Sequence, residues 1–302
     1  MKNIAFDDKP TREERWPHDR LAAAREAFEE WNDNCGKHVN AGEWVTIDEC
    51  LYNCRNQWAG KVYNPSKPHP YGINFKCLNE VLFPYTYRSE VYAGKLDIED
   101  LEYYIPNTLG ITKRLLEKYG WQKLKGSNLT TDNLYGSIPL AQLLLEKNMT
   151  LISTMRSNRK GLAKAMKDVQ DREENSTIVW HEKEKGKMTV TSYTPLTKSS
   201  GMKIILALSS IPNLPTLGVT RDDGKVKSAL LKTYDMTKGG TDICAQRKDS
   251  YTSNTKSRRW TTKILCYMLD ETRVNAQTVL ALNQNKDPRK VISFDFGWAL
   301  AK

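Results

Sequence analysis

The segment from Asn128 to Ser137 constrains the fold of this chain more than any other stretch. Residues 129–132 have the composition of a β-strand, and Asp132 stands where that strand runs into a polar turn. Ser137 is a favourable N-cap for a following helix with Pro139 in its first turn, where the missing N–H costs nothing. The sequence therefore predicts a strand, a tight turn and a helix. Taken alone, an aspartate at such a strand end is more often a turn or capping residue than a metal ligand.

Two other aspartates occupy comparable positions far away in the sequence. Asp48 lies near the end of Trp44–Glu49, whose alternation is typical of a half-buried strand. Asp242 follows Gly239–Gly240, which allows the backbone to turn sharply into a helix. In the first turn of that helix, the dipole favours an ionised carboxylate. A sheet that pairs the two strands, with the helix packed across them, could bring the three carboxylates together.

Three converging carboxylates would suit phosphodiester chemistry. Carboxylate oxygens are hard ligands for Mg²⁺ or Mn²⁺. Two such ions, roughly 4 Å apart, would activate a water or a 3′-hydroxyl and stabilise the leaving oxygen. Without cations the carboxylates would repel one another, so such a cluster would be tolerated for chemistry rather than for stability. The sequence thus offers Asp48, Asp132 and Asp242 as candidate ligands of a two-metal site.

The overall charge favours a polyanionic partner. The 302-residue chain carries a formal net charge of +10, which is common among nucleic-acid-binding proteins, although a merely basic soluble protein is the alternative. The six cysteines include no Cys-x-x-Cys pair and do not cluster with the four histidines, which argues against a structural zinc site. We expect buried free thiols in a reducing compartment, without a membrane span or a signal peptide.

Hydrophobic periodicity predicts the remaining elements. Strand-like patterns occur at 71–78, 83–92, 151–155 and 203–208, and weaker ones at 178–180 and 188–193 within a charge-rich stretch. The strand that ends at Asp132 is expected to begin at Trp121. Helical spacing predicts helices over 21–31, 107–119 and 258–283.

At these aspartates the sequence resembles the catalytic region of piggyBac-type transposases, including their domesticated derivatives. Seven motifs of the family have counterparts here in the same order: Thr46–Glu49, Lys67–Ile73, Tyr92–Lys95, Thr131–Ser137, Thr154–Gly161, Gly239–Asp242 and Arg259–Trp260. The matches cover residues 44–283. No single motif is decisive, but seven in order support the resemblance.

The resemblance implies an α/β fold, namely a ribonuclease H-like mixed sheet with flanking helices, a β-rich insertion, and helical N- and C-terminal flanks. The expected segments are a partial helical flank at 1–43, the first part of the core at 44–160, the β-rich insertion and return strand at 161–235, the core helix with the third aspartate at 236–250, and a truncated helical dimerisation and DNA-binding segment at 251–302. The family's C-terminal cysteine-rich zinc-binding domain has no counterpart here, so we expect a core fragment.

The resemblance also implies a function. Asp48, Asp132 and Asp242 would form a DDD triad that binds two Mg²⁺ or Mn²⁺ ions and both nicks and joins DNA. The expected partners are double-stranded DNA, with transposon ends and TTAA targets, and a second copy of the chain, and the expected location is the nucleus. Candidate DNA-binding residues are Arg156, Arg159, Lys160, Arg258, Arg259 and Trp260. A solvated surface position is the alternative for each basic residue, and a helix-packing anchor is the alternative for Trp260.

Several positions depart from the family pattern. Asn74 replaces a lysine, Ser153 a glycine, Lys238 a methionine, Thr241 a valine and Ala245 a second aspartate. Ala245 and the missing end-recognition parts favour a second hypothesis, a domesticated or decayed DNA-binding protein that no longer cuts DNA. A third hypothesis is a stable fold with no nucleic-acid role. Metal-dependent nicking that requires Asp132 would separate the first two, and salt-dependent DNA affinity would exclude the third.

Overall fold

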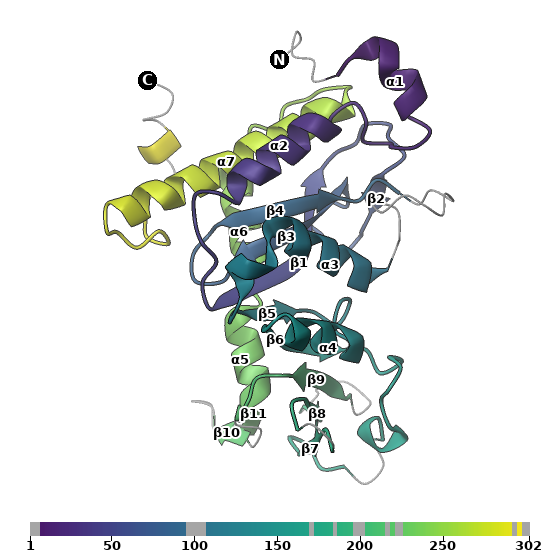
Figure 1. Ribbon diagram of the computed structural model, residues 1–302, viewed down its shortest axis with the longest axis vertical. Coiled ribbons are helices and arrows are strands. Elements are labelled where there is room, and N and C mark those ends of the chain that lie inside the picture. The colour runs from purple at the N-terminus through teal and green to yellow at the C-terminus, as the bar shows by residue number, and fades with distance from the viewer. Residues whose placement is uncertain are drawn as a thin grey trace. The chain divides into compact units, whose positions relative to one another are not determined.

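A computed structural model describes residues 7–94, 107–168, 172–183, 186–195, 203–214, 218–220, 226–291 and 295–297 of the chain. The chain divides into two compact units. The first unit combines residues 1–41, 48–120 and 240–302, and the second unit combines residues 42–47 and 121–239. The chain passes from the second unit to the first within one strand, β1 (Trp44–Asn53). Figure 1 shows the elements of both units along the chain.

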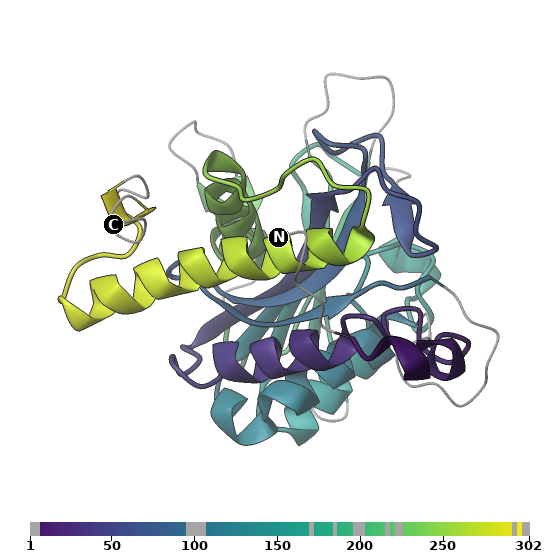
Figure 2. The same ribbon diagram turned by 90° about the horizontal axis from the view of Figure 1, so that it is seen from above.

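Strands and long helices make up the first unit. Its strands are the second half of β1, β2 (Lys61–Tyr63), β3 (Tyr71–Glu80) and β4 (Thr86–Val91). β3 is antiparallel to both β2 and β4 and is the neighbour of β1. The helices are α1 (Lys9–Arg15), α2 (Arg25–Cys35), α3 (Thr108–Tyr119), α6 (Gly240–Ser250) and α7 (Trp260–Asn283). Figure 2 shows α7 running alongside α2, with which it is in contact.

The second unit is built on a sheet that starts with the first half of β1. β5 (Asn128–Thr131) is parallel to β1, and β6 (Thr150–Met155) is parallel to β5. β9 (Ile205–Ser209), β8 (Thr189–Tyr193) and β7 (Thr177–His181) follow in antiparallel pairs. The other elements are α4 (Ile138–Glu146), α5 (Ala229–Thr237), 3-10 turns at Trp121–Leu124 and Lys164–Met166, and a ribbon of β10 (Gly218–Thr220) and β11 (Val226–Ser228).

The strand order confirms the predicted mixed α/β architecture. In the described part of the chain, nine strands form one mixed sheet in the order β2-β3-β1-β5-β6-β9-β8-β7, and β4 pairs with β3. The strands predicted in the charge-rich stretch therefore continue this sheet. None of the described helices is long and apolar enough to cross a membrane.

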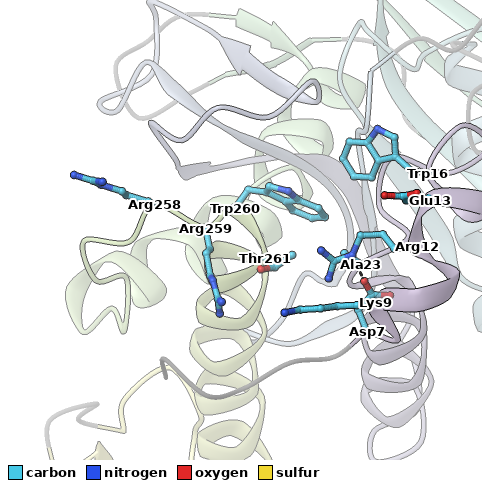
Figure 3. A pocket seen from close by; sticks show the side chains of 10 residues that line it. All are labelled: Asp7, Lys9, Arg12, Glu13, Trp16, Ala23, Arg258, Arg259, Trp260 and Thr261. Carbon is cyan, nitrogen blue, oxygen red and sulfur yellow. Dashed lines mark hydrogen bonds and ion pairs between the residues drawn. The ribbon is translucent and has the colours of Figure 1, made fainter.

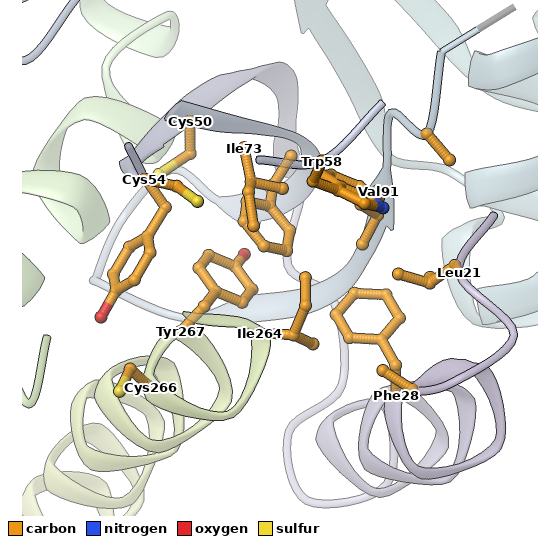
Figure 4. Close-up of a cluster of buried hydrophobic side chains, with 14 of the residues drawn as sticks. Leu21, Phe28, Cys50, Cys54, Trp58, Ile73, Val91, Ile264, Cys266 and Tyr267 are labelled. Carbon is orange, nitrogen blue, oxygen red and sulfur yellow. The ribbon is translucent and has the colours of Figure 1, made fainter. Parts of the chain in front are cut away.

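Each unit has its own apolar core. In the first unit, Ile264 and Tyr267 of α7 project into a cluster with Phe28 of α2 and Ile73 of β3 (Figure 4). The ring of Tyr267 stacks on Phe75 of β3 with the centroids 3.6 Å apart. The three-to-four spacing of apolar residues in α7 and the alternation in β3 produce this contact. In the second unit, α5 buries Leu230 and Leu231 against Ile152 and Ala207 of the sheet.

Two of the predicted elements differ from the structure. The prediction of a strand from Trp121 to Asp132 was wrong in its first half, where the chain forms a 3-10 turn. Gly120 and Gly126 on either side of this turn have positive φ angles of 114° and 88°, which a strand does not allow. The helix expected at 21–31 begins only at Arg25, because residues 21–24 are buried as a turn. The other predicted strands and helices lie within a few residues of those observed. Lys95 of the Tyr92–Lys95 motif lies outside the described residues, and the five-segment division of the chain stays a prediction.

Candidate active site

Asp132 lies directly after β5 and begins the tight turn that the sequence predicts. Its Oδ1 accepts a hydrogen bond from the Leu134 N–H at 2.9 Å, and its carbonyl oxygen accepts one from the Gly136 N–H at 3.0 Å. The turn leads into α4, where Ser137 caps the helix by accepting a hydrogen bond from the Leu140 N–H. The carboxylate of Asp132 therefore belongs to a turn residue and is half-buried in a fixed position.

The hydroxyl group of Ser153 on β6 stabilises this turn by hydrogen bonds. Its Oγ accepts a hydrogen bond from Thr131 Oγ1 at 2.9 Å. Its single hydroxyl proton is shared between the carbonyl oxygens of Asp132, at 3.1 Å, and Thr154, at 2.7 Å. A glycine at this position, as in the family motif, could make none of these bonds. Ser153 is thus a support for Asp132 that sequence reasoning recorded only as a departure from the family pattern.

Asp48 lies within β1, immediately after a residue that pairs with β5. The parallel register aligns Ile47 with Thr131, and Thr131 directly precedes Asp132. Asp48 is half-buried, and its Oδ1 accepts a hydrogen bond from the backbone N–H of Glu49 at 2.7 Å. The next carboxylate, Glu49, forms an ion pair with Lys76 of β3 and accepts a hydrogen bond from Asn74 Nδ2 at 3.3 Å.

Asp242 is exposed in the first turn of α6. The residue before it, Thr241, is 2% exposed, and its hydroxyl donates to Asn79 Oδ1 of β3 at 2.9 Å. Cys244, one turn further along, is also buried and accepts a hydrogen bond from Asn79 Nδ2 at 3.2 Å. The first turn of α6 is therefore anchored on β3, whereas the side chain of Asp242 faces solvent.

The three aspartates offer the right chemistry for a hard cation. Each supplies carboxylate oxygens, and none is fully buried, so that water and phosphate oxygens could complete the coordination of Mg²⁺ or Mn²⁺. Asp48 and Asp242 belong to the first unit and Asp132 to the second. Among the described residues, no group of three or more His, Cys, Asp or Glu side chains is close enough to hold a metal ion. The donor set of the three aspartates fits Mg²⁺ or Mn²⁺.

Two of the predicted DNA-binding residues contact the turn that follows Asp132. Arg156 Nε donates to Asn133 Oδ1 at 3.3 Å, and Arg159 Nη2 donates to the carbonyl oxygens of Asn133, at 3.4 Å, and Leu134. Lys160 is exposed. Arg156 and Arg159 therefore brace the turn in this structure and carry positive charge next to Asp132.

The other three predicted DNA-binding residues line part of a cavity of about 630 Å³ in the first unit (Figure 3). Arg258 and Arg259 are exposed, and Trp260 begins α7. The ring of Trp260 stacks on Trp58 with centroids 4.9 Å apart and planes inclined by 14°, and Trp16 lies 6.3 Å away. The packing alternative for Trp260 thus has direct support. Lys9 and Arg12 line the opposite side of this cavity (Figure 3). They come from the charged stretch before residue 20, and the sequence did not indicate them as candidate DNA-binding residues.

The cysteines do not form a metal site or a disulfide. All six are free and buried, as the sequence predicts. Burial raises the pKa of Cys77 to about 12 and that of Cys35 to about 12, well above the ordinary value of 9.0. These thiols are therefore protonated near neutral pH and are poor metal ligands.

The chain is similar to transposases by two comparisons. The family model described as Transposase IS4 matches residues 1–277. Among solved structures, the cryo-EM structure of the piggyBac transposase synaptic complex with hairpin DNA is similar with a TM-score of 0.82 and 24% identity. The match covers 98% of this chain and 59% of that transposase chain. A comparison with curated proteins gave no match.

Proposed function

This chain belongs to the Transposase IS4 family, and we propose from that premise that it is the catalytic core of a piggyBac-like DNA transposase. In this proposal it cuts and joins strands of double-stranded DNA with metal ions held by Asp48, Asp132 and Asp242. The observation that carries the proposal is the register of β1 and β5, which pairs Ile47 with Thr131. Each of these two paired residues is directly followed in the sequence by an aspartate, namely Asp48 and Asp132.

The surroundings of each aspartate suit a metal ligand. When bound, two Mg²⁺ or Mn²⁺ ions would supply an activated water or 3′-hydroxyl and stabilise the leaving oxygen of a phosphodiester. Asp132 is held in position by the Leu134 N–H and by Ser153, so little freedom is lost when an ion binds. Asp242 lies where the helix dipole stabilises a negative charge.

The charge of the chain supports DNA as the partner. The net charge of +10 favours phosphate binding, because each neutralised phosphate releases counterions. In the second unit, Arg156 and Arg159 place positive charge beside the turn of Asp132, and Lys160 is exposed. In the first unit, the exposed side chains of Arg258 and Arg259 precede α7.

Strand nicking tests the catalytic proposal. The full chain would be incubated with transposon-end DNA and Mg²⁺ or Mn²⁺, and nicked products would be measured on denaturing gels. We expect Asp132→Asn and Asp242→Asn to lower nicking by about 100-fold or more, because each removes a charged ligand. Asp249→Asn is the matched control, since Asp249 is exposed on the same helix as Asp242. Equal nicking by the parental protein and Asp132→Asn, or nicking by neither, would contradict the proposal.

A DNA-binding protein without catalysis is the second candidate. One observation favours it, namely the alanine at position 245, where the family pattern has a second aspartate. This candidate predicts DNA affinity that falls several-fold for each doubling of salt, without nicking at any Mg²⁺ or Mn²⁺ concentration. Salt-independent affinity would exclude both candidates.

Three further properties belong to the catalytic proposal. TTAA targets would be tested by sequencing the joints of strand-transfer products, and random flanking sequences would exclude this preference. Assembly as a homodimer would be tested by light scattering with and without DNA, and a monomer in both conditions would exclude it. Action on genomic DNA requires a nuclear location, which a fluorescent fusion of the chain would test, and a fusion that stays out of the nucleus would contradict it.

A further inference from the structure

A chain of buried hydrogen bonds crosses the first unit from α7 to the first turn of α6. Thr241 Oγ1 donates to Asn79 Oδ1 at 2.9 Å, and Asn79 Nδ2 donates to Thr86 Oγ1 at 2.6 Å. Thr86 Oγ1 then donates to Glu271 Oε1 at 2.6 Å, and the other carboxylate oxygen of Glu271 forms an ion pair with Lys248. None of these five side chains is more than 2% exposed. We call these five residues the relay.

The carboxylate of Glu271 fixes the direction of every bond in the relay. An ionised carboxylate only accepts, so the single hydroxyl proton of Thr86 must point toward Glu271. The Thr86 oxygen then accepts from the amide group of Asn79, which leaves the Asn79 carbonyl facing Thr241. The single hydroxyl proton of Thr241 completes the relay, because no other orientation satisfies all of these buried groups.

The relay ends next to Asp242. α6 follows Gly239, which has no side chain to cap the helix, so the bond from Thr241 to Asn79 anchors its first turn from inside. The family motif has valine at this position, and valine cannot donate a hydrogen bond. The anchor is therefore a feature of this chain's own residues.

We propose that the relay is a positioning device for Asp242, which orders the first turn of α6 and so sets the carboxylate for metal binding. Thr241, Asn79 and Thr86 are positioning residues here, since none of them would touch the ion. The inference rests on the proposed function for its metal ligand. A merely structural role would lower the overall stability of the protein and would leave the local order of this turn and the metal affinity unchanged.

The test compares Thr241→Val, which keeps the shape and removes the donor, with Thr241→Ser, which keeps the donor. Hydrogen exchange of the full chain without metal would follow the amides of Cys244, Ala245 and Gln246, which in an α-helix bond to the carbonyls of the first turn. Mn²⁺ affinity would be measured by electron paramagnetic resonance of the free ion. We expect Thr241→Val to speed exchange and to weaken Mn²⁺ binding, each by about 5- to 10-fold, and Thr241→Ser to change both by less than about two-fold.

A second substitution tests transmission through the relay. Thr86→Val removes the bond to Glu271 without touching Thr241, and we expect it to speed exchange in the first turn of α6 in the same way, whereas Thr86→Ser should not. The inference would be overturned if both valine variants kept the parental hydrogen exchange in the first turn of α6 and the parental Mn²⁺ affinity. This holds whether or not their overall stability falls. If the parental protein binds no Mn²⁺, the proposed function fails, while hydrogen exchange still decides whether the relay orders this turn.

Discussion

Gly136 lies so close to Thr154 that a Cβ on Gly136 would be 2.1 Å from the Thr154 carbonyl oxygen and 2.2 Å from Ser153 Oγ. Real Cβ atoms do not approach backbone so closely, so the turn after Asp132 can pack on β6 only with glycine here. We expect Gly136→Ala to lower the free energy of unfolding by roughly 1–3 kcal/mol, because the turn must move away from the strand. Urea unfolding would measure the loss.

Gly239→Ala is the matched control for this substitution. No atom lies within 4 Å of a Cβ built on Gly239, and its φ angle is not in the positive region. We expect the free energy of unfolding of this variant to stay within about 0.5 kcal/mol of the parental value. If Gly136→Ala were as stable as Gly239→Ala, the close contact with Thr154 would not constrain the turn.

The buried pair of Lys248 and Glu271 leads to a second prediction. Their side chains are 2% and 0% exposed. Burial opposes the charged form of Lys248, but its acidic neighbours Cys50 and Glu271 raise the pKa well above 10.5. The stabilisation by the charged lysine is therefore fully present below about pH 10.5 and is lost as pH rises through the higher folded value.

Glu271→Gln would leave the charge of Lys248 buried without its partner. We expect this variant to lose about 3–5 kcal/mol of unfolding free energy at pH 7, which urea unfolding would measure. The exposed pair of Lys238 and Asp235 is the control, and Lys238→Ala should change stability by less than about 1 kcal/mol. Similar small losses in both variants would mean that the buried pair contributes little.

The sequence predicts the parts of the fold that local patterns determine. Apolar spacing identifies α7 to within two residues of its start, alternation identifies β1, and the composition of a core strand identifies β6. The turn after Asp132 also follows from its polar residues and from Ser137 as cap. Each of these signals arises within one element, where the backbone and its immediate neighbours decide the outcome.

Long-range polar contacts escape prediction from a single sequence. Thr86 and Glu271 are 185 residues apart, and nothing near either of them indicates that they are buried together. Ser153 is a departure from a motif in the sequence and a support for Asp132 in the structure. Trp260 is a candidate for contact with DNA in the sequence, whereas its ring stacks on Trp58, which lies 202 positions earlier.

The buried thiols give a third prediction. Because burial raises the pKa of Cys35 and Cys77 from 9.0 to about 12, the unfolded chain loses these protons at lower pH than the folded chain does. Stability should therefore fall as pH rises from about 9 toward 12. At pH 8, Ellman's reagent should label none of the six cysteines rapidly in the folded protein and all six in guanidinium. Rapid labelling of any folded thiol would contradict this burial.

The stack of Trp260 on Trp58 gives the last prediction. Trp260→Ala should lower the free energy of unfolding, and so should Trp58→Ala, because each removes apolar contact in the same cluster. A double-mutant cycle should give a coupling of about 0.5–1.5 kcal/mol, as expected for paired aromatic rings. Trp260→Phe, which keeps a ring in the stack, serves as the control and should retain most of the stability. A coupling energy near zero would mean that Trp260 has no packing role. A coupling energy of the expected size, together with unchanged DNA affinity of Trp260→Ala, would mean that the ring packs on Trp58 and does not insert into DNA.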